Sequence, residues 1–252
     1  MTQRQEPQPS APVTMRIRAA EGYESSEEID LMAALLPLHG QRVLELGCGA
    51  AWTTRLLVGR LGAASVSAYE VDRIQHEKNL ALDLPGVTFH SGGAESIAEP
   101  DESFGAVLML KSLHHVPVAQ INRALREVHR VLKPGGLFYC SEPVYWGPFN
   151  DLMRLIEDER VVREAAFKAL VRAVGEGLFA LEQERFFQSE GNYPDWETFQ
   201  ARFIDVTHSE RNLDAARRAQ IRAAFERHLT PRAPASRSPI GWTCYASPFS
   251  GA

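Results

Sequence analysis

Two glycines one residue apart, Gly47 and Gly49, follow an apolar run that ends at Leu46. Glycine accepts positive φ angles and lets a ligand come close to the backbone. A helical pattern begins directly afterwards, and the N-terminus of a helix offers unpaired N–H groups and a partial positive charge. A strand, a tight turn and a helix in this order predict a nucleotide-sized binding point at the carboxyl end of a parallel strand.

A carboxylate at a fitting distance strengthens this prediction. Glu70 ends a second short apolar run, about twenty residues after the glycines, where ribose-binding acids lie in nucleotide sites. Ribose presents two neighbouring hydroxyl groups, and an ionised carboxylate can accept a hydrogen bond from each. The turn lacks the later glycine of the dinucleotide fingerprint, because Ala51 and Trp52 occupy the helix start. This argues against a nicotinamide-dependent oxidoreductase.

The elements that must position these residues alternate along the chain. Short apolar runs predict strands over 42–46, 65–70, 87–90, 104–110 and 137–141, with helical patterns between them. This alternation predicts an α/β fold with a doubly wound, mostly parallel sheet and helices on both faces. A strand over 179–189 and a last, antiparallel strand over 240–246 are expected to complete the sheet.

Four stretches in this order resemble the class I S-adenosylmethionine-dependent methyltransferases: 43–51, 66–72, 104–116 and 126–143. Residues 113–116 are similar to the segment after the family's fourth strand, and residues 126–136 to the helix and turn before its fifth. The resemblance points to the small-molecule, ubiquinone-biosynthesis-like branch. It implies a Rossmann-like sheet of seven strands with a helical cap insertion, and S-adenosyl-L-methionine as the cofactor.

The resemblance also implies which residues surround this cofactor. Glu45 would orient the turn and the methionine ammonium, and Glu70 would accept the ribose hydroxyls. Val71 would lie on one adenine face, Ala94 would offer its N–H to the adenine edge, and the carbonyl near Lys111 would meet the ammonium. The implied set is Glu45, Gly47, Cys48, Gly49, Glu70, Val71, Gly93, Ala94 and Lys111.

Few residues are candidates for direct chemistry, because the sulfonium already activates the methyl group and orientation can supply roughly 7–11 kcal/mol. His114 and His115 follow the fourth strand and are the candidate catalytic bases for a hydroxyl or thiol acceptor. A structural role for one histidine beneath the cap stays open. Candidates for the substrate pocket are Tyr23, Glu142, Tyr145 and Trp146. No cysteine pair has zinc spacing, so no metal site is predicted.

Three positions depart from the family pattern. Ala51 stands where a third glycine is common, and Gly93 stands where an acid often contacts the adenine amino group. Gly105 replaces a common aspartate in the fourth strand. The ribose acid and the two other glycines remain. The change at Gly93 removes one charge-assisted hydrogen bond and weakens the expectation of adenine binding.

Composition shifts divide the chain into four parts. Residues 1–14 are rich in Gln, Pro and Ser and predict a disordered tail. Residues 15–143 form the cofactor-binding core with an N-terminal helical lid. Residues 144–178 are expected to form the helical cap insertion, with one helix over 151–174, and 179–252 the remainder of the core. An inserted cap commonly carries substrate selectivity.

The bulk composition limits the partners. A net charge of −5 argues against a non-specific nucleic-acid binder. No apolar run approaches the 18 residues of a membrane span, and the N-terminus is polar, so neither a membrane segment nor a signal peptide is predicted. We expect a cytoplasmic location, a small-molecule partner and no nucleic-acid or membrane partner, and a homodimer is possible.

The leading hypothesis is therefore a methyltransferase that moves a methyl group to a small-molecule acceptor by in-line displacement, at an O, N, S or C atom. One alternative is a non-catalytic binding or interaction protein with the same fold. The absence of an acid at Gly93 is the reason to consider it. Another is an enzyme that uses S-adenosylmethionine without transferring its methyl group.

Overall fold

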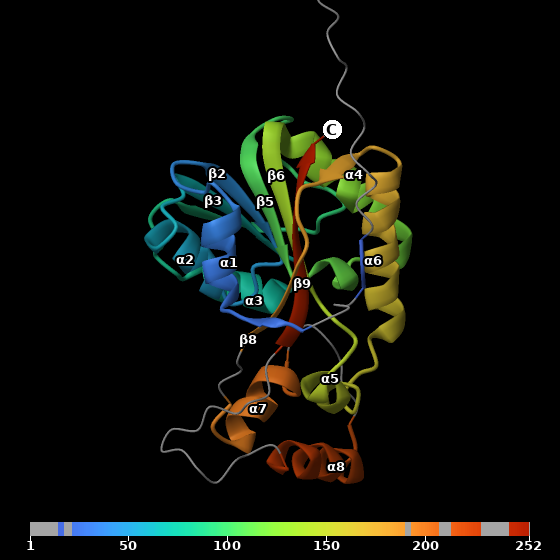
Figure 1. Cartoon of the computed structure of the whole chain (residues 1–252). Helices are drawn as coiled ribbons and strands as arrows, with labels where there is room; N and C mark the ends of the chain where they lie inside the picture. The colour runs from blue at the N-terminus through green and yellow to red at the C-terminus, as the bar shows by residue number, and fades with distance from the viewer. Residues whose placement is uncertain (1–14, 18–21, 190–192, 207–212, 228–241, 252) are drawn as a thin grey trace, which may run out of the picture.

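The computed structural model describes residues 15–17, 22–189, 193–206, 213–227 and 242–251 (Figure 1). The predicted tail over 1–14 lies outside these residues. Among the described residues, none of the helices combines the length and the apolar character that a membrane crossing requires.

Nine strands in the described part of the chain form one sheet, in the order β1-β8-β9-β6-β5-β2-β3-β4, with β7 also paired to β9. Neighbours from β6 to β4 are parallel, whereas β9 runs antiparallel to β6, β7 and β8. The strands are β1 Glu24–Ser25, β2 Arg42–Leu46, β3 Ser65–Glu70, β4 Val87–Ser91, β5 Phe104–Leu110, β6 Leu132–Pro143, β7 Phe179–Leu181, β8 Arg185–Ser189 and β9 Trp242–Gly251. The predicted α/β fold with a mostly parallel sheet is confirmed. Seven longer strands carry it, because β1 and β7 have only two and three residues.

Eight α-helices occur in the described residues. They are α1 Glu28–Leu35, α2 Trp52–Gly59, α3 Arg73–Leu80, α4 Ile121–Val131, α5 Pro148–Met153, α6 Arg160–Gly175, α7 Trp196–Phe203 and α8 Ala215–Glu226. In Figure 1, α1, α2 and α3 gather on one side of the sheet, and α4 and α6 on the other. Two short 3₁₀ helices, Leu113–His115 and Val118–Gln120, connect β5 to α4.

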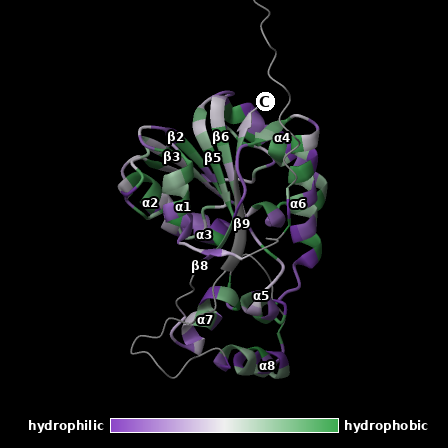
Figure 2. Ribbon diagram, in the orientation of Figure 1, coloured by the Kyte–Doolittle hydropathy of each residue, from purple (hydrophilic) through white to green (hydrophobic). Residues whose placement is uncertain are grey.

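Alternation along the strands builds two cores, one on each face of the sheet. Val43 and Leu108 face α1 and α2, whereas their neighbours Leu44 and Val107 face α4 and α6. Successive side chains of a strand point to opposite faces, so a strand covered on both sides is mostly apolar. The central strands are accordingly coloured mostly hydrophobic in Figure 2.

A third core lies away from the sheet. Phe149 of α5, Phe199 of α7 and Phe225 of α8 are all buried in it, together with Tyr193. These helices lie below the sheet in Figure 1, while α6 packs beside α4. The helix predicted over 151–174 was wrong, because α5 ends at Met153 and α6 begins only at Arg160. The predicted domain boundaries stay a prediction.

Candidate active site

The turn after β2 has the backbone geometry that its glycines permit. Gly47 has φ +81° and Gly49 has φ +50°. A Cβ on Gly47 would lie 2.7 Å from Cβ of Ser112, whose hydroxyl donates to the Leu46 carbonyl at 2.8 Å. No atom lies within 4 Å of the same position on Gly49. Gly47 therefore permits close packing against Ser112, and Gly49 leaves space for a ligand.

Glu70 lies beside this turn, at the end of β3. One oxygen of its buried carboxylate accepts from the Gly49 N–H at 2.8 Å, and the other accepts from the Asp72 N–H at 2.9 Å. The structure thus brings together the predicted turn and the predicted ribose acid. A carboxylate has lone pairs beyond these two bonds, so it retains acceptor capacity toward a ligand. Open space at Gly49 beside a fixed acceptor group fits an adenosine-type cofactor.

Two predicted cofactor residues in the same region are buried, and burial raises the pKa of both. Burial raises the pKa of Glu45 to about 7, against a hydrogen bond from Thr54 that lowers it, and the charge of Glu70 raises it further. The Thr54 hydroxyl donates to Glu45 at 2.6 Å. Burial also raises the pKa of Cys48, with added contributions from the charges of Glu45 and Glu70. Cys48 is therefore a neutral thiol rather than a nucleophile.

Asn79, a residue that the sequence analysis missed, supports the turn from α3. Its side chain is buried and donates to the Gly49 carbonyl at 2.7 Å. The same nitrogen lies 3.6 Å from Sγ of Cys48, and Gln75 donates to the Asn79 oxygen at 2.9 Å. A polar residue on the inward face of a helix was the available signal, because buried amides need partners.

The residues predicted around adenine spread along the same edge of the sheet. Val71 is 64% exposed, as a surface that covers a ligand would be, and Ala94 is buried. The Glu95 carboxylate lies where a side chain on Gly93 would stand. Position 93 itself has no acid, but the Glu95 carboxylate lies beside it.

Lys111 connects the end of β5 to the N-terminal helix. Its backbone has a positive φ of 55°, and its N–H donates to the Ser141 carbonyl at 2.6 Å. Its ammonium forms an ion pair with Glu28 of α1. This pair holds α1 against the carboxyl end of the sheet, where the lid was predicted.

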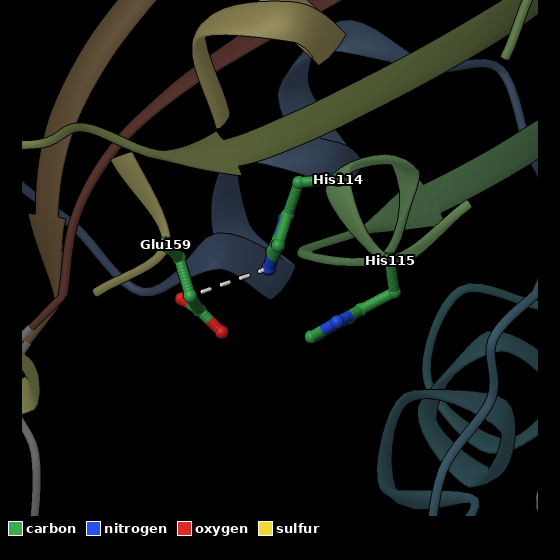
Figure 3. Close-up of side chains that lie close together, drawn as sticks. All are labelled: His114, His115 and Glu159. Atoms are coloured by element: carbon green, nitrogen blue, oxygen red, sulfur yellow. Dashed lines mark ion pairs between the residues drawn. The ribbon is translucent and has the colours of Figure 1, made fainter. Parts of the chain in front are cut away.

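The two histidines after β5 lie in a cluster with acids (Figure 3). Nδ1 of His114 lies 2.5 Å from an oxygen of Glu142, whose other oxygen accepts from the Leu113 N–H at 2.9 Å. Nε2 of His114 faces Glu159 at 3.9 Å. His115 is exposed, and its ring centroid lies 4.1 Å from that of His114. Sequence reasoning missed Glu159, which follows the histidines by some forty residues.

The charges in this cluster favour a proton on His114. Burial alone lowers the pKa of His114, but the charge of Glu142 and the hydrogen bond with it outweigh burial and raise the pKa. Glu159 adds to this rise, while Arg163 opposes it. For Glu159, burial raises the pKa, but Arg163 and His114 together lower it.

The predicted substrate-pocket residues do not all meet. Tyr23 stacks on Trp146 with ring centroids 5.4 Å apart and planes 9° apart, and Trp146 is 50% exposed. Glu142 is buried beneath His114. Tyr145 instead donates to Asp158 at 2.8 Å, in the connection between α5 and α6. The first two could contact a ligand directly, whereas Glu142 acts through the histidine.

Comparison with known proteins finds methyltransferases. Residues 43–136 match the family model of the methyltransferase domain. A demethylmenaquinone methyltransferase of Staphylococcus epidermidis is 29% identical over 70% of this chain and 71% of its own length. A ubiquinone biosynthesis O-methyltransferase of Cereibacter sphaeroides is 33% identical over 52% of this chain and 53% of its own. For a phthiotriol/phenolphthiotriol dimycocerosates methyltransferase of Mycobacterium ulcerans, identity is 36%, but the match spans only 40% of that relative.

Solved structures share the fold. The YcgJ protein of Bacillus subtilis aligns with a TM-score of 0.54 and 22% identity, over 88% of this chain and 96% of its own. The [4+2]-cyclase SpnF aligns with a TM-score of 0.53 and 20% identity, over 93% and 89%.

The fold and the match over residues 43–136 are those of a methyltransferase domain, which supports the expected S-adenosyl-L-methionine cofactor. This match agrees with the family resemblance that four sequence stretches predicted, and it covers less than half of the chain.

Proposed function

We propose that this chain transfers a methyl group to a small-molecule acceptor at the carboxyl edge of its sheet. Bound S-adenosylmethionine supplies a methyl group on a sulfonium, whose C–S bond breaks as the bond to the acceptor forms, the electron pair remaining on sulfur. The acceptor is thereby left with a proton to lose when it attacks through O–H, N–H or S–H. The protein must therefore bind the cofactor and the acceptor, align them, and accept the proton that the acceptor loses.

Glu70 carries the cofactor part of this proposal. Its carboxylate is fixed by the N–H groups of Gly49 and Asp72 beside open space at the glycine turn. Glu95 supplies the acid that position 93 lacks. The proposed cofactor-binding residues remain Glu45, Gly47, Cys48, Gly49, Glu70, Val71, Gly93, Ala94 and Lys111.

His114 and His115 are the proposed groups that meet the acceptor's proton. Glu142 orients His114 through Nδ1, so that Nε2 faces outward to Glu159. The Tyr23–Trp146 stack offers a flat apolar surface, on which an aromatic or quinone-type ring can pack. The names of the demethylmenaquinone and ubiquinone relatives support an acceptor of that class.

The remaining expectations belong to the same proposal. They are a cytoplasmic location, a homodimer, and no nucleic-acid or membrane partner. The net charge of −5 supports the absence of a nucleic-acid partner. Sedimentation equilibrium of the full chain measures the oligomeric state.

Calorimetric titration with S-adenosylhomocysteine tests the cofactor site. We expect saturable binding at one equivalent, and at least about 100-fold weaker binding by Glu70→Ala, because two charge-assisted hydrogen bonds are each worth roughly 1.5–3 kcal/mol. Unchanged affinity in this variant would remove Glu70 from the site.

Product mass then separates the alternatives. Incubation with S-adenosylmethionine and hydroxylated aromatic acceptors should give a product heavier by one CH₂. Cofactor binding without any change in acceptor mass would favour an enzyme of another kind, since the cyclase neighbour has the same fold. Absence of cofactor binding would favour the non-catalytic protein.

A further inference from the structure

His114, His115 and Glu159 place three ligand atoms at one point. One ring nitrogen from each histidine and one carboxylate oxygen all lie within 4.8 Å of one another. The histidines belong to the 3₁₀ helix after β5, Glu159 directly precedes α6, and the three side chains converge in Figure 3. Glu159 makes no side-chain cap to its own helix, and its carboxylate lies between Arg163 of α6 and His114.

The spacing is close to that of a metal centre. Imidazole nitrogens and carboxylate oxygens bind Zn²⁺ at about 2.0–2.2 Å, so two ligands of a tetrahedral ion lie roughly 3.4 Å apart. Nε2 of His114 is 3.9 Å from Oε2 of Glu159, and the three groups each offer a ligand atom within 4.8 Å of the others. Side-chain rotations that shorten these separations toward roughly 3.4 Å would bring the ligands to bonding distance.

Glu142 gives His114 the orientation that a ligand needs. An ionised carboxylate only accepts hydrogen bonds, so the Nδ1 atom that it contacts carries the proton and Nε2 keeps the lone pair when the ring is neutral. Metal-binding histidines commonly donate their other N–H to a carboxylate in this way. Glu142 is itself held by the Leu113 N–H at 2.9 Å.

Arg163 reduces the net negative charge of the cluster but leaves one oxygen of Glu159 available as a ligand. Its guanidinium donates two hydrogen bonds to Oε2 of Glu159, at 2.5 and 3.1 Å, and another to Asn150 at 3.0 Å. The second oxygen, Oε1, keeps its lone pairs for another partner. With neutral histidines the charges of Glu142, Glu159 and Arg163 sum to −1, which favours a divalent cation. A proton on His114 competes for the same lone pair.

We propose that His114 Nε2, His115 and Glu159 bind one divalent transition-metal ion, of the kind that accepts imidazole ligands, such as Zn²⁺ or Co²⁺. Three protein ligands leave a position open for a small molecule, as in catalytic metal sites. The role of this ion rests on the proposed function: it would bind the acceptor's oxygen and lower the pKa of its hydroxyl, so that the histidines would act on the acceptor's proton through the ion rather than as direct bases. The existence of the site does not depend on that function.

Direct metal titration tests the site on the full chain after chelator treatment and dialysis. Addition of Co²⁺ should give a visible absorption band that saturates at one equivalent, and Zn²⁺ should displace it. His115→Ala and Glu159→Gln should each weaken binding at least about 10-fold, and Glu142→Gln by about 10- to 100-fold, because it orients a ligand. His39→Ala is the matched control, since His39 is exposed and precedes β2 at the opposite edge of the sheet.

The proposal is overturned if no saturable band forms, or if His115→Ala and Glu159→Gln bind Co²⁺ as the His39→Ala protein does. Both variants change residues at the surface or half-buried, and circular dichroism checks their folding. Titration of the same samples with S-adenosylhomocysteine separates the two proposals. Cofactor binding without metal binding rejects only the metal site, and the reverse result rejects only the cofactor site.

Discussion

Replacement of Glu45 by glutamine should change how the stability of the protein depends on pH. Glu45 is 2% exposed on β2, and burial is the main reason that its pKa rises from 4.5 to about 7. A hydrogen bond from Thr54 lowers this pKa, and the charge of Glu70 raises it. Glutamine keeps the shape and an acceptor for Thr54, but it has no charge to bury.

The size and the sign follow from the two pKa values. A rise from 4.5 to about 7 corresponds to about 3 kcal/mol at roughly 1.4 kcal/mol per pKa unit. Between these values the folded protein holds a proton that the unfolded chain has released. The contribution of Glu45 to stability is therefore complete below pH 4.5 and is lost as the pH rises through 7.

Urea denaturation measures this effect. Free energies of unfolding of the wild type and Glu45→Gln are compared at intervals from about pH 5 to pH 8. We expect the wild type to lose up to about 3 kcal/mol relative to the variant across this range. Glu77→Gln, at an exposed position of α3, is the matched control and should follow the wild type. A difference between wild type and Glu45→Gln that is flat with pH, or that grows in favour of the wild type, would refute the burial argument.

Three further changes test the turn and the outer helices. In urea denaturation, Gly47→Ala should lower the free energy of unfolding by more than Gly49→Ala does. Positive φ costs an alanine roughly 1–2 kcal/mol at either position, but only a side chain at position 47 would also clash with Ser112. Equal losses of stability would contradict the contact between Gly47 and Ser112. Asn79→Ala should cost about 1–3 kcal/mol and weaken cofactor binding, since the Gly49 carbonyl loses its partner; unchanged binding would deny Asn79 this role. Phe199→Ala should cost about 3–5 kcal/mol and speed hydrogen exchange in α7 and α8, while the sheet stays protected; equal deprotection of the sheet would mean one cooperative unit.

Apolar continuity made the central sheet predictable. The strands at 42–46, 65–70 and 104–110 have the bounds that their apolar runs predicted. A strand buried on both faces is mostly apolar, so its ends lie close to the ends of the apolar run. Glu70 at one such end was predictable for the same reason.

The bounds of the outer helices and strands are set by short polar segments, and local sequence patterns do not show which of these segments end an element. The run Glu157-Asp158-Glu159 separates α5 from α6, where one helix was expected. A single strand was predicted over 179–189, but residues 182–184 separate β7 from β8. Tertiary packing decided each of these boundaries.

Contacts between side chains far apart in the sequence could not be predicted from local patterns. Glu159 meets His114 only because α6 packs against the 3₁₀ helix after β5, and no sequence spacing announces that contact. Asn79 reaches the glycine turn only because α3 packs over it. The positions of both histidines were predictable from the end of β5, whereas the acids that surround His114 were not.

The position of β9 has a consequence for the order of folding. β9 lies between β6 and β8, and its register joins Phe138 to Phe249, more than a hundred residues apart. Closing so long a loop costs more conformational entropy than pairing β2 with β3 or β5. We therefore expect the parallel half to assemble first and β9 to dock late, joining β1, β7 and β8 to the sheet in one step. The cofactor turn after β2 belongs to the parallel half that assembles first. The edge strand β1, which leads into α1, becomes fixed only when β9 pairs with β6 and β8.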